Sequence, residues 1–285
     1  MSGPPKNDPM VSTVWLGEHL GEPDVQVIDA SWFMAGENRS GRGEYDQAHI
    51  PGALFFDIDA VADRTSDLPH MLPTPQDFAR EAGALGLSRD AQVVVYDSLG
   101  IRSAARVWWT LRVMGFPRVQ VLDGGFPKWR AEGRPIETDR PTPEPTTLPS
   151  VYDPELVRDI EAVRQLLSER DAQLIDARSG ERFRGEAPEP RAGLRSGHMP
   201  GALNLPFGEV VGPQGTLKPA AELRRAFETA GADLSRPIVT SCGSGVTAAV
   251  LALALARLGR EDVAVYDGSW TEWAGRTDTA VVAGR

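Results

Sequence analysis

The residues best suited to carry out chemistry surround the only cysteine of the chain. Cys242 follows the apolar run 238–241 and precedes the loop Gly243-Ser244-Gly245-Val246-Thr247, after which an apolar helical pattern begins. The start of a helix presents unpaired N–H groups and a partial positive charge, and both favour the nucleophilic thiolate. The glycines let the backbone curl around the sulfur without Cβ clashes. The pattern therefore predicts a reactive thiolate, with a buried, inert cysteine as the alternative.

Other chemistries also fit parts of this loop. Gly243-Ser244-Gly245-Val246-Thr247-Ala248 matches G-x-G-x-x-A, the dinucleotide-binding pattern, and Asp267 lies at the end of the next strand run. Against a nucleotide site, no later strands complete a second mononucleotide-binding half, and such a site does not need Cys242. A cysteine phosphatase would carry an arginine six residues after the cysteine, where Ala248 stands, and the lysine of a phosphate-binding P-loop is also missing.

Composition narrows the class of protein. The chain has 285 residues, is 41% hydrophobic and 25% charged, and carries a net charge of −10. These values are typical of a globular protein. The negative net charge argues against nucleic acid as a partner, because nucleic-acid-binding proteins usually present a basic face. A single cysteine excludes an internal disulfide, and neither a signal peptide nor a membrane span is evident. We therefore expect a cytoplasmic protein without a membrane partner.

The sequence contains an internal duplication. Three phrases of the first half return in the second half in the same order: Val-Ile-Asp-Ala at 27–30 as Leu-Ile-Asp-Ala at 174–177, His-Ile-Pro-Gly-Ala at 49–53 as His-Met-Pro-Gly-Ala at 198–202, and Asp-Gly-Gly at 123–125 as Asp-Gly-Ser at 267–269. The offsets are 147, 149 and 144, close to half the chain. A period this long indicates tandem domains rather than a solenoid.

Each half alternates short strand patterns with helical ones. Strands are expected at 25–29, 92–97, 119–123, 173–176, 237–241 and 263–266, and helices at 103–114, 219–230 and 246–258. Alternation of this kind predicts an α/β fold in which a small parallel sheet has helices on both faces, with ligands at the carboxyl ends of the strands. A proline-rich linker at 139–150 would separate an N-terminal domain, 1–138, from a C-terminal domain, 151–285.

The duplication, the His-Ile-Pro-Gly-Ala phrase and the Cys-Gly-Ser-Gly-Val-Thr loop resemble the two-domain rhodanese sulfurtransferases, over almost the whole chain. Further matching phrases lie at 57–59, 69–73, 106–109 and 266–270. The neutral loop letters resemble the 3-mercaptopyruvate branch, whereas thiosulfate-specific members more often carry cationic residues after the cysteine. The resemblance implies two tandem rhodanese-like domains, of which only the second is catalytic, because Asp97 stands where the second half has Cys242.

The resemblance also implies roles for individual residues. Cys242 would hold a persulfide, and the N–H groups of Gly243, Ser244, Gly245, Val246 and Thr247 would stabilise its charge. Arg182 and Arg191 match the arginine pair that binds the donor's carboxylate and keto oxygen, although surface ion pairs with neighbouring glutamates would also explain them.

His49 matches a histidine thought to act with the loop serine, here Ser244, and an aspartate. The position aligned with that aspartate is Asn38, so a complete triad would need Asp46 or Glu44 instead. His198, the repeat mate of His49, is expected to be structural. Arg102, in the loop after Asp97, would either add positive potential near an anionic donor or face solvent.

The function that follows is transfer of sulfur from 3-mercaptopyruvate through the Cys242 persulfide to a thiol acceptor such as thioredoxin, or to cyanide, with release of pyruvate. Thiosulfate sulfurtransfer is the closest alternative, and a non-catalytic module binding an anion or peptide is the alternative of another class. No metal or organic cofactor is expected, because the sequence shows no ligand spacing for one.

Overall fold

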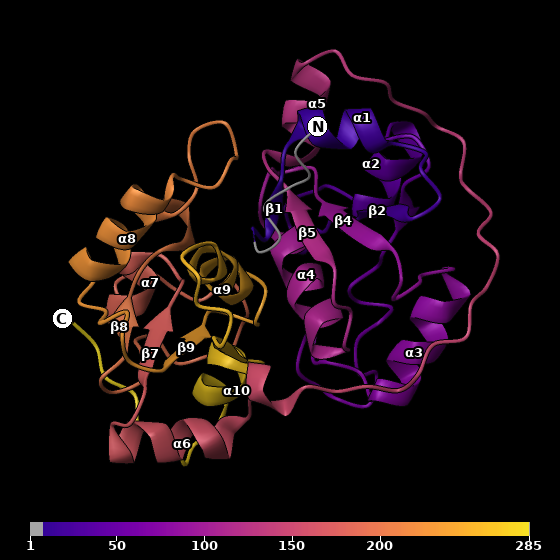
Figure 1. The fold of residues 1–285 in the computed structure, drawn as a ribbon. Coiled ribbons are helices and arrows are strands. Elements are labelled where there is room, and N and C mark those ends of the chain that lie inside the picture. The colour runs from indigo at the N-terminus through magenta and orange to yellow at the C-terminus, as the bar shows by residue number, and fades with distance from the viewer. Residues whose placement is uncertain (1–7, 285) are drawn as a thin grey trace. The chain divides into compact units, whose positions relative to one another are not determined.

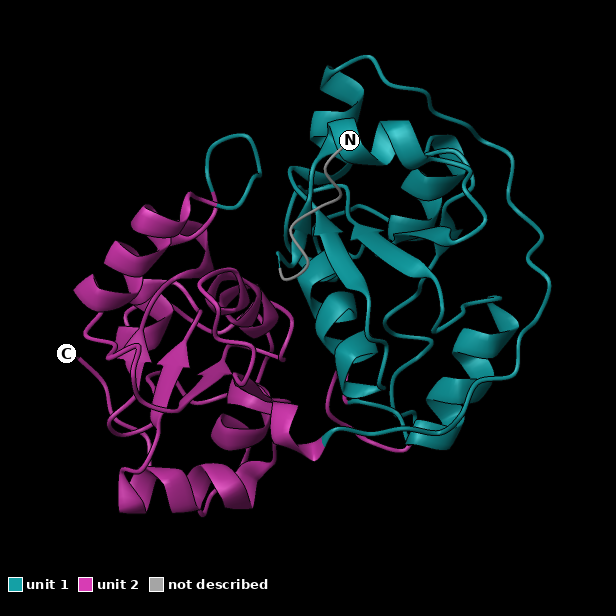
Figure 2. Ribbon diagram, in the orientation of Figure 1, with its two compact units in different colours: residues 1–64, 72–153, 212–217 teal, residues 65–71, 154–211, 218–285 magenta. Residues whose placement is uncertain are grey.

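The computed structural model describes residues 8–284, which form two compact units (Figures 1 and 2). Within these residues, the first unit comprises 8–64, 72–153 and 212–217, and the second comprises 65–71, 154–211 and 218–284. Two short segments therefore belong to a different unit from the residues that flank them: 65–71 is part of the second unit and 212–217 is part of the first. One of them, 65–71, carries a residue of the candidate site described below.

The first unit is built on a five-stranded parallel sheet with the strand order β1-β5-β4-β2-β3. The strands are β1 (Met10–Val11), β2 (Val25–Asp29), β3 (Leu54–Phe55), β4 (Gln92–Tyr96) and β5 (Val119–Leu122). Side chains alternate between the two faces along a strand. On β4, Val94 and Tyr96 join a hydrophobic cluster with Leu16, Trp129 and their neighbours.

Helices cover both faces of this sheet. Their bounds are α1 (Thr13–His19), α2 (Gly41–Gln47), α3 (Pro75–Ala84), α4 (Ser103–Val113) and α5 (Gly125–Ala131). The cluster that contains Val94 takes side chains from α1, α2 and α5, whereas α4 packs against β4 and β5 from the other side (Figure 1).

The second unit repeats this plan, with the strand order β6-β10-β9-β7-β8 in a second parallel sheet. Its strands are β6 (Val157–Arg158), β7 (Gln173–Asp176), β8 (Leu203–Asn204), β9 (Ile238–Ser241) and β10 (Ala264–Tyr266). Its helices are α6 (Ile160–Glu169), α7 (Gly180–Arg184), α8 (Ala220–Thr229), α9 (Ala248–Arg257) and α10 (Ser269–Gly275), with 3-10 turns at Pro154–Leu156 and Phe207–Glu209. The predicted α/β fold with two tandem parallel sheets is confirmed.

Two helix starts differ from the sequence prediction. The helix expected from position 246 begins at Ala248, because Gly245 adopts a left-handed φ of +75° and Thr247 forms the N-cap. The helix expected from Pro219 begins at Ala220, with Pro219 as an extended N-cap. The later start of α9 lengthens the loop after Cys242, so more of its N–H groups lie outside the helix.

The proline-rich segment 139–150 contains no helix or strand, as expected where every second residue from 141 to 145 is a proline without an N–H group to donate. It lies along the first unit rather than hanging free. The Thr146 N–H donates to the Gly83 carbonyl at 2.9 Å, and the Thr146 hydroxyl donates to the Leu87 carbonyl at 2.5 Å. Across residues 8–284, none of the helices has both the length and the apolar character needed to cross a membrane.

Candidate active site

Cys242 stands directly after β9, which lies inside the second sheet between β10 and β7. The carboxyl ends of parallel strands are where α/β folds bind ligands. Cys242 is a free thiol with 2% of its surface exposed. An inert core cysteine would be equally buried, so the surroundings of the loop must distinguish the two interpretations.

Ser269 shapes the cysteine loop from the adjacent β10–α10 corner. Its hydroxyl accepts hydrogen bonds from the N–H groups of Cys242 at 3.2 Å and Gly245 at 3.1 Å, and donates to the Tyr266 carbonyl at 2.8 Å. The Cys242 carbonyl accepts from the Trp270 N–H at 2.9 Å. Ser269 is held with a left-handed φ of +51°, an unusual conformation for a residue with a side chain. This role of Ser269 was not predicted from the sequence, although Ser269 belongs to the repeated phrase at 267–269.

Two arginine side chains lie over Gly243. A Cβ atom built on Gly243 would be 3.3 Å from Nη2 of Arg182 and 3.9 Å from Nη1 of Arg191. Both guanidinium groups therefore lie beside the residue that follows Cys242. The structure thus brings together the cysteine and the two arginines that the sequence analysis selected, all within the second unit.

A buried ion-pair network positions Arg182. Its Nη2 donates to Oε2 of Glu189 at 2.5 Å, and the Glu189 side chain is only 2% exposed. Oε1 of Glu189 accepts from Nη1 of Arg178 at 2.7 Å, and Arg178 in turn binds Asp176 at the end of β7. Arg182 is therefore not in a solvated surface pair: its partner is buried and anchored to the sheet. Such a network holds the guanidinium in a defined orientation.

His70 lies beside the second arginine. Its Nε2 is 3.4 Å from Nη2 of Arg191, and the residue is 7% exposed, with a left-handed φ of +62°. The segment 65–71 that carries it is grouped with the second unit (Figure 2). The phrase at 69–73 was matched only as part of the family resemblance, and no role was predicted for His70 from the sequence. Its contact with Arg191 joins positions 121 residues apart, which local patterns do not reveal.

His49 is fully buried in the first unit. Its Nδ1 is 2.7 Å from the Tyr45 carbonyl, its Nε2 is 3.2 Å from the Asp139 carbonyl, and its ring stacks on Tyr45. The carboxylate near it belongs to Glu137, with Oε1 3.5 Å from Nε2. Neither Asp46 nor Glu44 takes that place: they pair with Arg140 and Arg39, respectively.

The repeat mate His198 makes the same arrangement in the second unit. Its Nδ1 is 2.8 Å from the Phe183 carbonyl and its ring stacks on Phe183, while its backbone forms an isolated antiparallel bridge, as that of His49 also does. Because both units contain this histidine arrangement, it indicates a structural role in the fold.

Arg102, for which two orientations were considered from the sequence, forms an ion pair with Glu37 at 3.1 Å.

The first repeat shows what this strand–loop–helix corner can bind. The Asp97 carboxylate, 1% exposed, accepts from the N–H groups of Leu99 at 2.8 Å, Arg102 at 2.7 Å and Ala104 at 2.8 Å. With the offset of 145 that relates Asp97 to Cys242, these donors correspond to Ser244, Thr247 and Ala249. In the first repeat, three backbone N–H groups therefore point at the side chain in the position that corresponds to Cys242.

The remaining loop residues line the same corner. Ser244 and Val246 are 6% and 4% exposed, and Thr247 is half-buried.

Within residues 8–284, no group of three or more His, Cys, Asp or Glu side chains has the arrangement needed to hold a metal ion.

Comparison with known proteins agrees with this architecture. The model of the rhodanese-like domain matches residues 12–132 and 159–276, and the chain belongs to this family. It is 44% identical to the 3-mercaptopyruvate sulfurtransferase of Escherichia coli strain K12, over 95% of this chain and 96% of that protein. It is 41% identical to the human protein of the same name, over 96% and 94% of the two chains.

A solved structure matches as well. SseA from Escherichia coli, described in its structural report as a 3-mercaptopyruvate sulfotransferase, superposes with a TM-score of 0.85 at 43% identity, covering 92% of this chain and 98% of SseA. The family resemblance read from the sequence is thereby confirmed.

Proposed function

We propose that this chain is a sulfurtransferase that takes sulfur from 3-mercaptopyruvate, holds it as a persulfide on Cys242 and passes it to a thiol acceptor. The observation that carries this proposal is the position of Arg182 and Arg191 over Gly243, beside the only cysteine. Whole-length similarity to proteins named 3-mercaptopyruvate sulfurtransferase supports the same activity.

In the first step the Cys242 thiolate attacks the sulfur of the donor. A sulfur–sulfur bond forms, the carbon–sulfur bond breaks, and the electron pair passes to the carbon as the enolate of pyruvate. The proton of the donor thiol ends on that carbon, giving pyruvate and the Cys242 persulfide anion. Arg182 and Arg191 bind the carboxylate and the keto oxygen, on which charge develops, and guanidinium forks suit both groups.

The persulfide anion is then held by backbone N–H groups. The N–H groups of Ser244, Thr247 and Ala249 correspond to those that bind Asp97 in the first unit. Gly243, Gly245 and Val246 complete the loop around the sulfur. A preorganised set of donors stabilises an anion without reorganisation at the moment of transfer. In the second step an acceptor thiol attacks the outer sulfur and regenerates the Cys242 thiolate. Thioredoxin is the protein acceptor that we propose.

Among the histidines, we propose that His70 acts by positioning Arg191, because its ring contacts that guanidinium. The role transferred to His49, with Ser244 as its partner, has less support, because the His49 ring is completely buried and its nitrogens face backbone carbonyls. We therefore assign His49 to the packing of the first unit. A chain with one cysteine that must stay reduced suits the cytoplasm.

Thiosulfate is the second candidate donor. A relative from Cricetulus griseus named thiosulfate sulfurtransferase is 44% identical over 93% of this chain. The neutral loop Gly243-Ser244-Gly245 favours mercaptopyruvate, because thiosulfate is a dianion whose sulfonate would gain from cations in the loop itself.

Intact mass spectrometry after donor treatment tests the persulfide. Wild-type protein treated with 3-mercaptopyruvate should gain the mass of one sulfur atom, and Cys242→Ser should gain none. Addition of dithiothreitol should remove the extra mass and release sulfide. Unchanged mass in the wild type would favour a non-catalytic binding module instead.

Steady-state kinetics test the donor and the arginine pair. Arg182→Gln and Arg191→Gln should each lower kcat/KM for mercaptopyruvate by about 10- to 100-fold, the value of a charge-assisted hydrogen bond of about 1.5 to 3 kcal/mol. Arg184→Gln is the matched control, because Arg184 lies on the same helix but pairs with the exposed Glu186. A higher kcat/KM with thiosulfate than with mercaptopyruvate would reject the donor assignment.

A further inference from the structure

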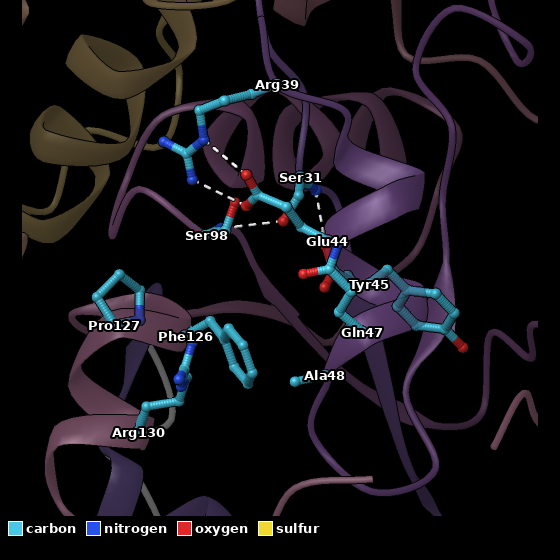
Figure 3. Close-up of a pocket in the computed structure, with 11 residues that line it drawn as sticks. Ser31, Arg39, Glu44, Tyr45, Gln47, Ala48, Ser98, Phe126, Pro127 and Arg130 are labelled. Carbon is cyan, nitrogen blue, oxygen red and sulfur yellow. Dashed lines mark hydrogen bonds and ion pairs between the residues drawn. The ribbon is translucent and has the colours of Figure 1, made fainter. Parts of the chain in front are cut away.

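The first unit contains a pocket that the proposed reaction does not use. It has a volume of about 480 Å³ and opens at the carboxyl ends of β2 and β4 (Figure 3). Asp29 is one of the lining residues. Figure 3 shows Ser31 and Glu44 on one side of the pocket and Phe126 and Arg130 on the other. All of the lining residues belong to the first unit.

The second unit fills the corresponding place with an arginine. Asp29, Ser31 and Phe126 correspond to Asp176, Arg178 and Trp270 at the offsets of the duplication. The Arg178 side chain is fully buried, and its guanidinium carbon lies 4.1 Å from the centre of the Trp270 ring. Its nitrogens donate to both carboxylate oxygens of Asp176 at 2.7 to 3.1 Å, to Glu189 and to the Gly197 carbonyl.

The first unit keeps the frame of this site, but residue 31 supplies no guanidinium to Asp29. The guanidinium carbon of Arg130 lies 5.8 Å from the centre of the Phe126 ring, at the margin of stacking distance, compared with 4.1 Å for Arg178 and Trp270. The Ser31 N–H donates to Oδ1 of Asp29 at 2.8 Å, as the Arg178 N–H does to Oδ1 of Asp176 at 2.9 Å. The backbone contact is therefore the same in both repeats, whereas the side chain at position 31 ends at a hydroxyl. An aromatic ring is also retained, because Phe126 stands where the second unit has Trp270.

The carboxylates of the pocket differ in how their charge is balanced. Glu44 binds Arg39 through two hydrogen bonds of 2.6 and 2.8 Å, which hold the pKa of Glu44 below its ordinary value. Asp29 is 2% exposed and forms no ion pair within residues 8–284, and burial raises its pKa to about 6 despite hydrogen bonds from Ser31 and Tyr96. Arg39 is itself held, with its guanidinium carbon 3.9 Å from the centre of the Phe33 ring.

We propose that this pocket binds a guanidinium group, which takes the place that Arg178 occupies in the second unit. Asp29 accepts two parallel N–H donors, and Phe126 provides the aromatic face on which the planar cation stacks. The group is supplied either by a small guanidinium compound or by an arginine side chain of a peptide, since the chemistry recognised is the same. The proposal does not depend on the sulfur-transfer reaction.

Isothermal titration with methylguanidinium chloride tests the site. Saturable binding with a Kd on the order of 1 mM is expected for so small a ligand. The peptides Gly-Arg-Gly and Gly-Lys-Gly distinguish the sources: equal or tighter binding of the arginine peptide indicates a peptide ligand, and weaker binding indicates a small molecule. Equal binding of the lysine peptide would overturn the proposal, since an ammonium lacks the planar fork.

Substitutions at position 31 provide the decisive comparison. Ser31→Arg supplies the missing guanidinium from within, so it should abolish methylguanidinium binding and raise the melting temperature. Ser31→Ala is the matched control and should still bind. Asp29→Asn should weaken binding at least tenfold. Persistence of binding in folded Ser31→Arg protein, or absence of binding in the wild type, would overturn the proposal. Sulfur transfer, measured in parallel, should be unchanged by Ser31→Arg.

Discussion

Replacing Asp29 by asparagine should change how the stability of the protein depends on pH. Asp29 is almost fully buried at the end of β2, and burial raises its pKa from the ordinary value of 3.8 to about 6. The native protein therefore binds the Asp29 proton more tightly than the unfolded chain does. As a result, stability falls as the pH rises from about 4 to about 6 and this carboxyl ionises. Asparagine keeps the size of the side chain and does not ionise.

The size of the effect follows from the two pKa values. Each pKa unit corresponds to about 1.4 kcal/mol, so ionised Asp29 costs the native state about 3 kcal/mol relative to the unfolded chain. Below pH 4 the residue is protonated in the native state and this cost is absent. Linkage between protonation and unfolding then gives a loss of about 1.4 kcal/mol between pH 5 and pH 8 from this residue alone. Most of that loss should occur below pH 6.5.

Urea denaturation at pH 5 and pH 8 measures this loss. The difference in unfolding free energy between Asp29→Asn and wild type should move by about 1.4 kcal/mol in favour of the variant at the higher pH. Other ionisable groups cancel in this difference. Asp24→Asn, at an exposed position just before the same strand, is the control and should follow the wild type. Parallel stability–pH curves for Asp29→Asn and wild type would refute the reasoning.

Three further predictions concern the two loop corners and the histidines. Gly243→Ala should lower kcat/KM for mercaptopyruvate by roughly tenfold, because the new Cβ lies 3.3 Å from Nη2 of Arg182 and displaces that group. The thermal midpoint should stay close to that of the wild type. Unchanged kinetics would contradict the role of the Arg182 guanidinium. Asp97→Ala should cost about 3 kcal/mol in urea denaturation, because buried N–H donors lose their acceptor, whereas a cost below about 1 kcal/mol would show that water replaces the carboxylate. His70→Asn should raise KM for mercaptopyruvate more than it lowers kcat, whereas His49→Asn should lower stability with little change in the kinetics of the folded protein; the opposite pattern would restore His49 to catalysis.

Some of this site could be predicted because its determinants are local in the sequence. Cys242 follows a short apolar run and precedes glycines and a helical pattern, and that order is enough to place a sulfur at a strand–loop–helix corner. The duplication needed only matching phrases at a constant offset. Offsets of 145 and 147 then relate Asp97 to Cys242 and Ser31 to Arg178, so a repeated sequence also predicts which positions correspond.

Other features depended on packing between distant segments. His70 reaches Arg191 across 121 positions, and Ser269 reaches the N–H groups of the cysteine loop across 24 and 27 positions. In the sequence, Arg182 is one of several charged residues near glutamates, a pattern that also fits an exposed surface ion pair. Its burial against Glu189 depends on how α7 and the following loop fold onto the sheet. His49 lies in a sequence phrase that resembles one with a catalytic histidine. Only the tertiary structure shows that its ring is enclosed by Tyr45 and backbone carbonyls.

The sequence by itself therefore determined the fold class, the duplication, the family resemblance and the strand–loop–helix corner that carries Cys242, because each is encoded in short-range order or in a nearly constant period. Only the tertiary structure decided which charged and ring-bearing side chains gather at that corner and which are enclosed in the core. It also revealed the pocket beside Asp29. The physical reason is that burial and charge pairing are properties of chain segments brought together by folding, and their energies depend on distances that no local pattern specifies.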